Sequence, residues 1–305
     1  MRLRSLALTL CCWAIAAAAE APLSIEQVRP GVYVHAGLVD DWLPGNGGDV
    51  ANLGFIVGSR CVAVIDSGGT PAIGQRLRAA IERVTPLPVC FVINTHMHPD
   101  HVLGNSAFGG SSATPPQFIA HAKLAAALAA RERTYLNVLQ RDFGINATLV
   151  YPTRGIEGDT ELDLGGRTLL LHAWRTAHTD NDLTVYDRQT RTLFLSDLLF
   201  VGHLPVLDGS LRGWLGVLAE IATLDVAFAV PGHGAPSTDW PGALSAQVTY
   251  LTALRDQTRK AIRQRQTIRQ AVDQVARDEA AGWQLADQFH RRNVTAAYAE
   301  LEWED

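Results

Sequence analysis

Residues 95–101 of the 305-residue chain read THMHPDH, which places His96, His98, Asp100 and His101 in one short segment. The segment directly follows the apolar run CFVINT, so we expect it in a loop at the carboxyl end of a strand, where α/β sheets place their sites. Imidazole and carboxylate groups suit a borderline divalent metal such as zinc. One short loop cannot wrap a single ion with all four groups. The segment therefore predicts two adjacent ions, each with further ligands from elsewhere.

Three later positions supply candidates for those further ligands. His178 follows the strand-like run LLLHAWRTA, Asp197 follows TLFLS, and His233 comes shortly after VAFAV. Because each residue lies just past a predicted strand, one edge of the sheets can gather all three. A lone histidine in such a place is usually an ordinary core residue. Three such positions beside a four-ligand loop instead predict a metal centre.

The rest of the chain alternates strand-like and helix-like segments in two successive halves. Helical spacing of apolar residues marks 71–84, 121–139 and 210–224. Strand-like runs bounded by turn residues occupy 32–35, 53–57, 62–65, 90–93, 160–164, 167–174, 183–186, 192–195 and 226–230. The strand–helix–strand order over 62–93 predicts that part of the sheet is parallel. Two such halves packed sheet against sheet, with helices outside, predict an α/β fold of the four-layer αββα type.

The N-terminal segment has the features of an export signal. Residues 1–19 read MRLRSLALTLCCWAIAAAA, with a positive start, an apolar run and a small-residue cleavage pattern. This pattern predicts a cleaved Sec-type signal peptide and a periplasmic or secreted protein, with an uncleaved membrane anchor as the alternative. We expect residues 20–305 to form one domain, with a helical C-terminal extension from about residue 243 that covers an outer face.

The composition argues against several other classes of protein. A hydrophobic fraction of 47% is too high for a disordered chain, and a formal net charge of −5 is unusual for a nucleic-acid-binding protein. A basic run in residues 255–269 is most simply a solvated helix face, with nucleic-acid or anionic-lipid binding as the alternative. We therefore expect a small-molecule substrate as the partner; the sequence does not indicate an oligomeric state.

Two cysteines follow the predicted signal peptide. Cys61 and Cys90 each open an apolar run, CVAVID and CFVINT, so both can lie on neighbouring parallel strands. We interpret them as buried free thiols, and a disulfide between them is the alternative in an oxidising compartment.

The segment THMHPDH resembles the His-x-His-x-Asp-His signature of the metallo-β-lactamase superfamily. Asp66 in AVIDSG, His178 in AHTDND, Asp197 in LSDLLF and His233 in PGHG match the other motifs of the family, in the same order. The resemblance covers nearly all of the chain after residue 19. It implies the metallo-β-lactamase-like αββα sandwich and a zinc-dependent metallohydrolase.

The resemblance also implies two zinc ions, with iron or manganese as alternatives, and assigns ligands to each ion. The first ion is bound by His96, His98 and His178, and the second by Asp100, His101 and His233. Asp197 bridges the ions, as in the glyoxalase II-like branch, whereas some lactamases carry a cysteine ligand there. His98 departs from the flavo-diiron branch, which carries glutamate at that position. Asp66 is expected to orient a loop backbone or a ligand from outside the metal shell.

Several flanking segments are similar to a narrower group within the superfamily. These segments are GDVANLGFIVG, TAHTDNDLTVY, FVGHLPVLDGSLRGW and RRNVTAAYAELE. The group comprises exported bacterial zinc metallohydrolases associated with quinoprotein relay and sulfur-oxidation systems. The similarity implies a role beside a periplasmic quinoprotein dehydrogenase system.

A two-metal site predicts hydrolysis of an ester, thioester, lactone or lactam bond by a hydroxide shared between the ions. Asp100 is the catalytic candidate that orients this hydroxide and moves its proton. Trp42, in a long loop over residues 37–52, and His203 are candidate substrate contacts, with structural roles as the alternatives. Two other functions remain open: a non-hydrolytic carrier of a quinone-type cofactor, and a mono-iron thiol dioxygenase.

Overall fold

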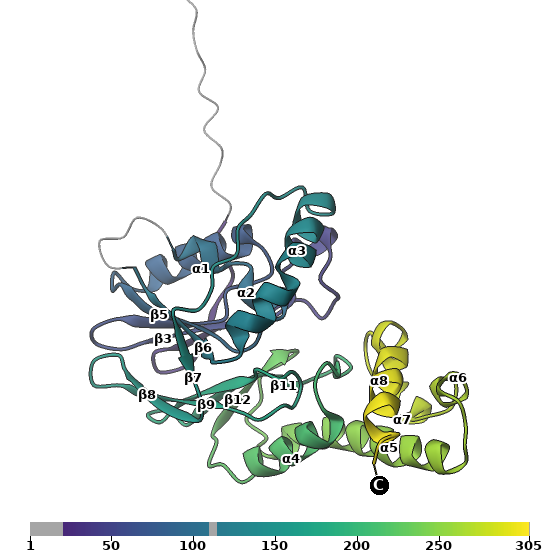
Figure 1. Cartoon of the computed structure of the whole chain (residues 1–305). Helices are drawn as coiled ribbons and strands as arrows, with labels where there is room; N and C mark the ends of the chain where they lie inside the picture. Colours follow the sequence, from purple (N-terminus) through teal and green to yellow (C-terminus); the bar gives the residue numbers. More distant parts are fainter. Residues whose placement is uncertain (1–20, 110–114, 305) are drawn as a thin grey trace, which may run out of the picture.

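Two β-sheets pack face to face, with helices on both outer sides, in the computed structural model of the chain (Figure 1). The structure describes residues 21–109 and 115–304. The predicted signal peptide, residues 1–19, lies outside the described residues. Among the described helices, none is both long enough and apolar enough to span a bilayer.

The first sheet has seven strands in sequence order. They are β1 (Glu26–Arg29), β2 (Val32–His35), β3 (Leu53–Val57), β4 (Val62–Ile65), β5 (Val89–Asn94), β6 (Gln117–His121) and β7 (Arg154–Ile156). The first four strands pair antiparallel, and β4 to β7 pair parallel. The predicted strand–helix–strand unit is confirmed, because β4 and β5 are parallel neighbours joined by α1 (Pro71–Val84).

The second sheet has five strands in the order β12, β11, β10, β9, β8. Their bounds are β8 (Asp159–Asp163), β9 (Thr168–Ala173), β10 (Leu183–Asp187), β11 (Thr192–Phe200) and β12 (Phe228–His233). Buried side chains of both sheets form one apolar cluster between them, including Ile56, Ile93, Leu171, Val185 and Phe194. This cluster is the core that makes the two sheets one sandwich.

Helices cover the outer face of each sheet. On the first sheet these are α1, α2 (Pro99–Val102) and α3 (Leu124–Arg141). On the second they are α4 (Leu211–Ile221) and α5 (Ser245–Arg263). The remaining C-terminal helices, α6 (Ile268–Val272), α7 (Arg277–Ala280) and α8 (Ala286–Leu301), pack on α5 and on one another at the side of the sandwich. Short 3-10 turns occupy η1 (Pro44–Asn46), η2 (Asn105–Ala107) and η3 (Gly242–Leu244). The four-layer αββα fold predicted from the sequence is confirmed.

Local sequence explains where α1 begins and which face it buries. Thr70 caps the helix, since its Oγ1 accepts a hydrogen bond from Ile73 N at 3.3 Å, and Pro71 fits the first helical position. Ile73, Leu77 and Ile81 recur at helical spacing and pack on the first sheet.

The helix expected over residues 121–139 is present as α3, but its expected start is wrong. The helix begins at Leu124, and His121 is the last residue of β6, a strand that the sequence did not predict. The strand QFIAH is short and is paired in parallel on both sides, by β5 and β7. Its pairing across the sheet, rather than its own pattern, makes this segment a strand.

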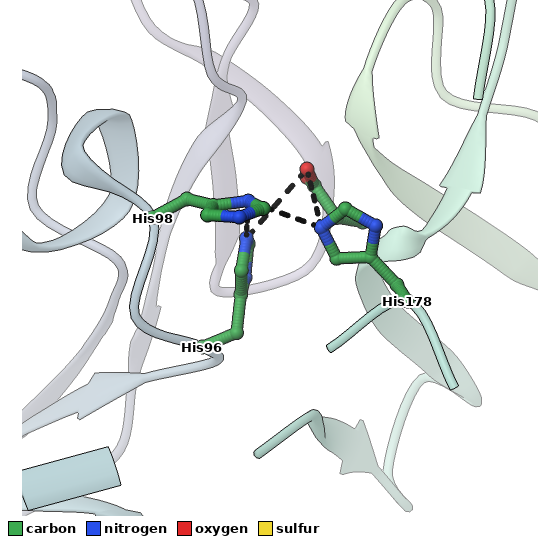
Figure 2. A group of neighbouring side chains, drawn as sticks. His96, His98 and His178 are labelled. Carbon is green, nitrogen blue, oxygen red and sulfur yellow. Dashed lines mark hydrogen bonds and ion pairs between the residues drawn. The ribbon is translucent and has the colours of Figure 1, made fainter. Parts of the chain in front are cut away.

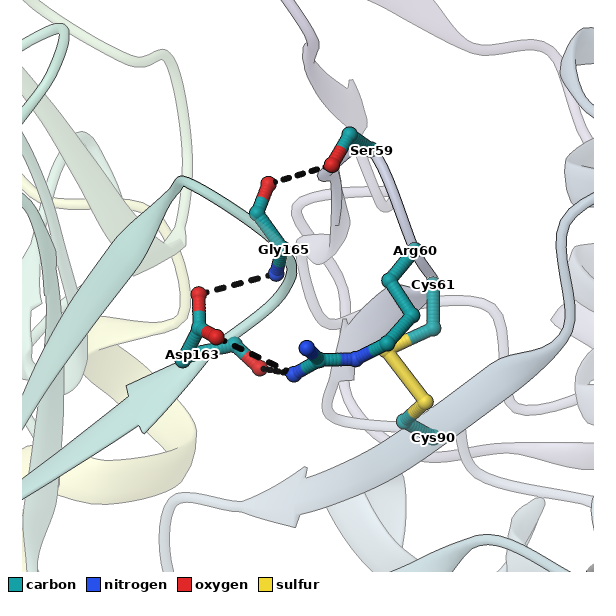
Figure 3. The surroundings of a disulfide bond; sticks show 6 residues. All are labelled: Ser59, Arg60, Cys61, Cys90, Asp163 and Gly165. Carbon is teal, nitrogen blue, oxygen red and sulfur yellow. Dashed lines mark hydrogen bonds and ion pairs between the residues drawn. A yellow bond between two sulfur atoms is a disulfide. The ribbon is translucent and has the colours of Figure 1, made fainter.

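The interpretation of Cys61 and Cys90 as free thiols is also wrong. The two residues form a disulfide with a Cα–Cα distance of 5.7 Å, a typical spacing (Figure 3). The register of β4 and β5 shifts between the Val62–Val89 and Ala63–Phe91 pairs, so Cys90 is an extra residue in its strand. This bulge lets Cys90 meet Cys61, and the sequence pattern gives no sign of it.

Candidate metal centre

Three histidines and one aspartate converge on a single point between the sheets. His98 Nδ1 lies 3.0 Å from His96 Nε2 and 3.1 Å from His178 Nε2 (Figure 2). Asp197 Oδ2 lies 3.4 Å from His178 Nε2 and 3.6 Å from His96 Nε2. His96 and His98 come from the loop after β5, whereas His178 comes from the loop between β9 and β10. Two sheets therefore build this first ligand group together.

A second group of ligand atoms lies beside the first. Asp100 Oδ2 is 3.4 Å from His101 Nε2 and 3.3 Å from His233 Nε2. The remaining oxygen of Asp197, Oδ1, is 3.1 Å from His101 Nε2 and 3.5 Å from His233 Nε2. Within each group all ligand atoms lie within 4.8 Å of one another. Asp197 thus turns one carboxylate oxygen toward each group.

The polar atoms of these groups fit metal ions. His101 Nε2 and Asp197 Oδ1 are buried and, although they lie 3.1 Å apart, neither makes a hydrogen bond with a described residue. Leaving buried polar atoms without partners is costly, so such atoms in a folded protein need an explanation. A divalent cation held by imidazole nitrogens and carboxylate oxygens would satisfy both atoms.

Each of the five histidines holds its other ring nitrogen against a fixed partner. These contacts are His96 Nδ1 to Thr95 Oγ1 (3.1 Å), His98 Nε2 to Asp208 Oδ2 (3.1 Å), His101 Nδ1 to Asp66 Oδ2 (2.8 Å), His178 Nδ1 to Val206 O (2.7 Å) and His233 Nδ1 to Val50 O (3.0 Å). Such outer contacts fix the ring orientation and raise the basicity of the ligating nitrogen in metal sites. The rings are thereby preorganised as ligands.

Asp66 lies directly behind the second group, outside the ligand atoms. Its carboxylate accepts hydrogen bonds from Thr95 N and Thr95 Oγ1, both at 2.8 Å, besides its contact with His101. Asp66 itself has a φ of 58°, in the left-handed region that non-glycine residues rarely adopt. This conformation places one carboxylate against both the loop backbone and a histidine ring.

Asp197 lies inside a strand, which corrects the expectation that it follows one. Strand β11 continues to Phe200, and its pairing with β12 shifts register around Ser196, whose φ is 48°. The irregular turn at Ser196 aims the Asp197 carboxylate at the ligands. Similarly, His233 is the last residue of β12 and does not lie beyond it.

Burial and charge affect the two ligand groups differently. Burial lowers the pKa of His178 to about 3, so its imidazole is neutral, the form that binds metals. Burial also lowers the pKa of His233, but the carboxylates of Asp197 and Asp100 outweigh it and raise that pKa to about 9. The carboxylates of the second group therefore favour a positive charge beside them, which a divalent cation would supply.

The ligands open onto a pocket of about 170 Å³. Apolar and aromatic side chains form much of its wall: Trp42, Val50, Phe200, Val206 and Phe289. Trp42 is fixed by a hydrogen bond from Nε1 to Gly69 O at 3.0 Å. His203 also lines the pocket, and burial lowers its pKa to about 4, so its ring is neutral. The structure thus brings both candidate substrate contacts to the metal centre.

Sequence reasoning missed several residues of the site. Asp208 supports His98, and Arg292 Nη2 donates to Asp208 Oδ1 at 2.9 Å. Phe289 and Arg292 both line the pocket although they lie on α8, so the C-terminal helices do more than cover an outer face. No local pattern marks these residues, since only the packing of α8 brings them to the loop after β5.

Comparison with known proteins places the chain in a family. Residues 46–233 match the Metallo-beta-lactamase superfamily, over more than half of the sequence and across every ligand described above. The chain therefore belongs to the metallo-β-lactamase superfamily, and its His/Asp site indicates a metal-dependent hydrolase. No curated protein matches the sequence significantly.

Solved structures share the same fold at low sequence identity. A metallo-β-lactamase from Pontibacter korlensis is 19% identical, with a TM-score of 0.61, and the match covers 75% of this chain and 99% of that one. A metallo-β-lactamase from Hirschia baltica is 18% identical, with a TM-score of 0.59 and coverage of 76% and 98%. A variant of the sec-alkyl sulfatase PisA1 is 15% identical, with a TM-score of 0.68, and the match covers 92% of this chain and 51% of that one.

Proposed function

We propose that this chain is an exported hydrolase that holds two zinc ions and cleaves an ester, thioester, lactone or lactam in a small molecule. The observation that carries the proposal is the division of the Asp197 carboxylate, with Oδ2 toward the first ligand group and Oδ1 toward the second. A carboxylate placed in this way is suited to bridge two ions.

When bound, two divalent ions would act as Lewis acids toward a water molecule and toward the oxygen of the bond to be cleaved. Asp100 is placed to handle the proton of the attacking water. Its Oδ2 faces His101 and His233, whereas its Oδ1 accepts no hydrogen bond from the described residues, and the side chain lines the pocket. Burial raises the pKa of Asp100, but the two histidines outweigh it and keep the carboxylate ionised.

The second ligand group favours this proposal over a mono-iron dioxygenase. An enzyme with one iron would need only the first group, His96, His98 and His178 with Asp197. Here Asp100, His101 and His233 form a second buried set, and His101 Nε2 faces carboxylate oxygens of Asp197 (3.1 Å) and Asp100 (3.4 Å) without making a hydrogen bond to any described residue. Two ions account for both sets.

We also propose that the protein is exported and serves a periplasmic quinoprotein dehydrogenase system. The disulfide between Cys61 and Cys90 supports an oxidising compartment, because such bonds are rare in the cytosol. The N-terminal sequence of residues 1–19 supports the same location. The quinoprotein connection rests on the similarity of the segments flanking the metal ligands.

The proposal is tested by metal analysis paired with a hydrolysis screen. We expect about two zinc ions per chain and turnover of at least one bond among ester, thioester, lactone and lactam substrates. Asp100→Asn should abolish most of this turnover, whereas Asp278→Asn, on the exposed start of α7, should not. One iron per chain, or tight binding of a quinone-type cofactor without any hydrolysis, would contradict the proposal. Full activity of a metal-replete Asp100→Asn protein would remove the proposed role of Asp100.

A further inference from the structure

We infer that Arg292 and Phe289 of α8 form an anion-recognition end of the pocket, so that the substrate is an apolar molecule carrying a carboxylate or another oxyanion. This inference rests on the proposed hydrolase and names its substrate class. Both side chains line the same pocket as Asp100, Asp197 and His233.

The Arg292 guanidinium has donors to spare. Its Nη2 donates to Asp208 Oδ1 at 2.9 Å, and Nε and Nη1 make no hydrogen bond with the described residues. A guanidinium offers five N–H donors in a planar fork that matches a carboxylate. The side chain is about half exposed, at 51%, so a ligand in the pocket has access to it.

The surroundings of Asp208 leave positive charge at this end of the pocket. Two guanidinium groups approach this one carboxylate, that of Arg292 at 2.9 Å and that of Arg131 at 3.6 Å. Asp208 Oδ2 also contacts His98 Nε2 at 3.1 Å. One carboxylate cannot balance two cations, so an anionic group of the substrate would complete the balance.

Besides the metal-ligand candidates Asp100 and Asp197, the pocket is lined by two further acids, whose carboxylates already have hydrogen-bond partners. Asp40 and Asp41 lie on the loop between β2 and β3. The oxygens of Asp40 accept hydrogen bonds from Asp41 N (2.8 Å) and Asn46 Nδ2 (3.0 Å), and Asp41 Oδ1 accepts one from Trp42 N (2.8 Å). These carboxylates are therefore engaged by their own loop, and the α8 end is the part of the pocket suited to an anion.

The position of Arg292 relative to the metal ligands is fixed by its neighbour on α8. Asn293 Oδ1 accepts a hydrogen bond from Leu207 N at 2.9 Å, and Asn293 Nδ2 donates to Pro205 O at 2.6 Å. Both partners belong to the loop that carries Asp208. Phe289 stacks on the ring of His203, with centroids 5.5 Å apart, and adds an apolar surface beside the guanidinium. Rigid placement of this kind is what substrate positioning requires.

A pair of aryl esters of nearly the same shape, one anionic and one neutral, tests the inference once each rate is divided by the rate of hydroxide hydrolysis of the same ester. The substrates are 4-carboxyphenyl acetate, an anion, and its neutral counterpart 4-carbamoylphenyl acetate, offered to the metal-loaded protein. We expect wild-type kcat/KM to be about tenfold higher for the anion. This is the effect expected of one hydrogen bond to a charged group that is partly screened by solvent. In Arg292→Gln the ratio should fall to about one, and Arg292→Lys should keep part of it.

Arg131→Gln is the matched control, since Arg131 contacts the same carboxylate from α3 but does not line the pocket. It removes one of the two positive charges around Asp208 but leaves the free donors of Arg292, so it should keep most of the wild-type preference, whereas Arg292→Gln loses it. If both glutamine variants lose the preference equally, Arg292 acts only through Asp208 and the inference is wrong. A wild-type preference for the neutral ester would also overturn it.

A binding measurement separates this inference from the proposed function. If neither ester is hydrolysed, the hydrolase proposal fails, and calorimetry with 4-hydroxybenzoate still tests the anion site without turnover. The wild-type protein should bind this probe about tenfold more tightly than Arg292→Gln, and the affinity of Arg131→Gln should lie closer to that of the wild type. Equal affinity in all three proteins would exclude the anion site.

Discussion

Asp66 holds the ring of His101 from behind: Asp66 Oδ2 lies 2.8 Å from His101 Nδ1, while His101 Nε2 lies 3.1 Å from Asp197 Oδ1. A carboxylate on one ring nitrogen fixes the tautomer, so the other nitrogen presents its lone pair to the ligand cluster. Asp66 is therefore a positioning residue for the second ligand group.

Replacing Asp66 with asparagine should weaken the binding of the second metal ion. Asn keeps the size but has one acceptor oxygen for the four donors that now contact the carboxylate, on Thr95, Ser196 and His101. We expect a 10- to 100-fold loss of affinity at the second ion, measured by competition with a chelator. Asp159→Asn is the control, because Asp159 contacts His172 in the same way but lies on the surface. Unchanged affinity for both ions in Asp66→Asn would contradict this role.

A methyl group at Gly232 should disturb Asp197. A Cβ at this position would collide with Asp197 Oδ1 and would approach Asp197 N to 2.7 Å. Because Gly232 is buried on β12 beside β11, we expect Gly232→Ala to reduce metal content and to destabilise the fold by about 1–3 kcal/mol. Gly282→Ala, where a Cβ meets open space, should leave both quantities unchanged. Metal quantitation and urea unfolding measure the two effects, and normal metal content in Gly232→Ala would refute the steric argument.

Much of the metal centre follows from sequence because its ligands stand in short motifs beside strands. A strand has a strong local pattern, and parallel strands carry their carboxyl ends to one edge. Knowing only that THMHPDH follows CFVINT is enough to expect a metal centre there. The motif order of the family then points to His178, Asp197 and His233 as further ligands.

Other parts depend on packing between distant segments, which local patterns do not report. The bulge that pairs Cys90 with Cys61 is set by the register of two strands. Arg292 reaches the pocket because Asn293 holds α8 against the loop of Asp208. Residues of this kind are ordinary in sequence and gain a role only from tertiary contacts.

The disulfide should contribute substantially to stability. Its cysteines are 29 residues apart, and closing a loop of that length is worth about 3–4 kcal/mol in the chain-entropy view. We expect the free energy of unfolding of the Cys61→Ala/Cys90→Ala double variant to be lower by an amount of that order, so that it unfolds at a lower denaturant concentration. Alkylation of the unfolded, unreduced protein should leave the mass of both cysteines unchanged. Quantitative labelling of both thiols without reductant would show that the bond does not form.

A buried ion pair links the two sheets and makes stability depend on pH. Arg167 donates from Nε to Asp187 Oδ1 at 3.0 Å and from Nη2 to Oδ2 at 2.7 Å, and its Nη1 donates to Val57 O in the first sheet at 3.1 Å. Burial raises the pKa of Asp187, but the bonds from Arg167 and Thr190 outweigh it and hold the pKa below its usual value.

Arg167→Met should destabilise the fold by about 3–5 kcal/mol at pH 7, because it leaves the Asp187 carboxylate buried without a cation. A carboxyl group whose pKa is lower in the folded protein stabilises the fold at pH values above its pKa in the unfolded chain, which is about 3.9. This stabilisation is lost as the pH falls toward the pKa in the folded protein. The difference between wild type and variant should therefore shrink below about pH 4. Urea unfolding at pH 7 and pH 3.5, with chelator present throughout, measures this difference.

Arg188→Met, which breaks the exposed pair with Glu161, is the control and should change stability by less than about 1 kcal/mol at either pH. A variant difference that stays constant with pH would show that Arg167 acts through packing and not through the charge of Asp187.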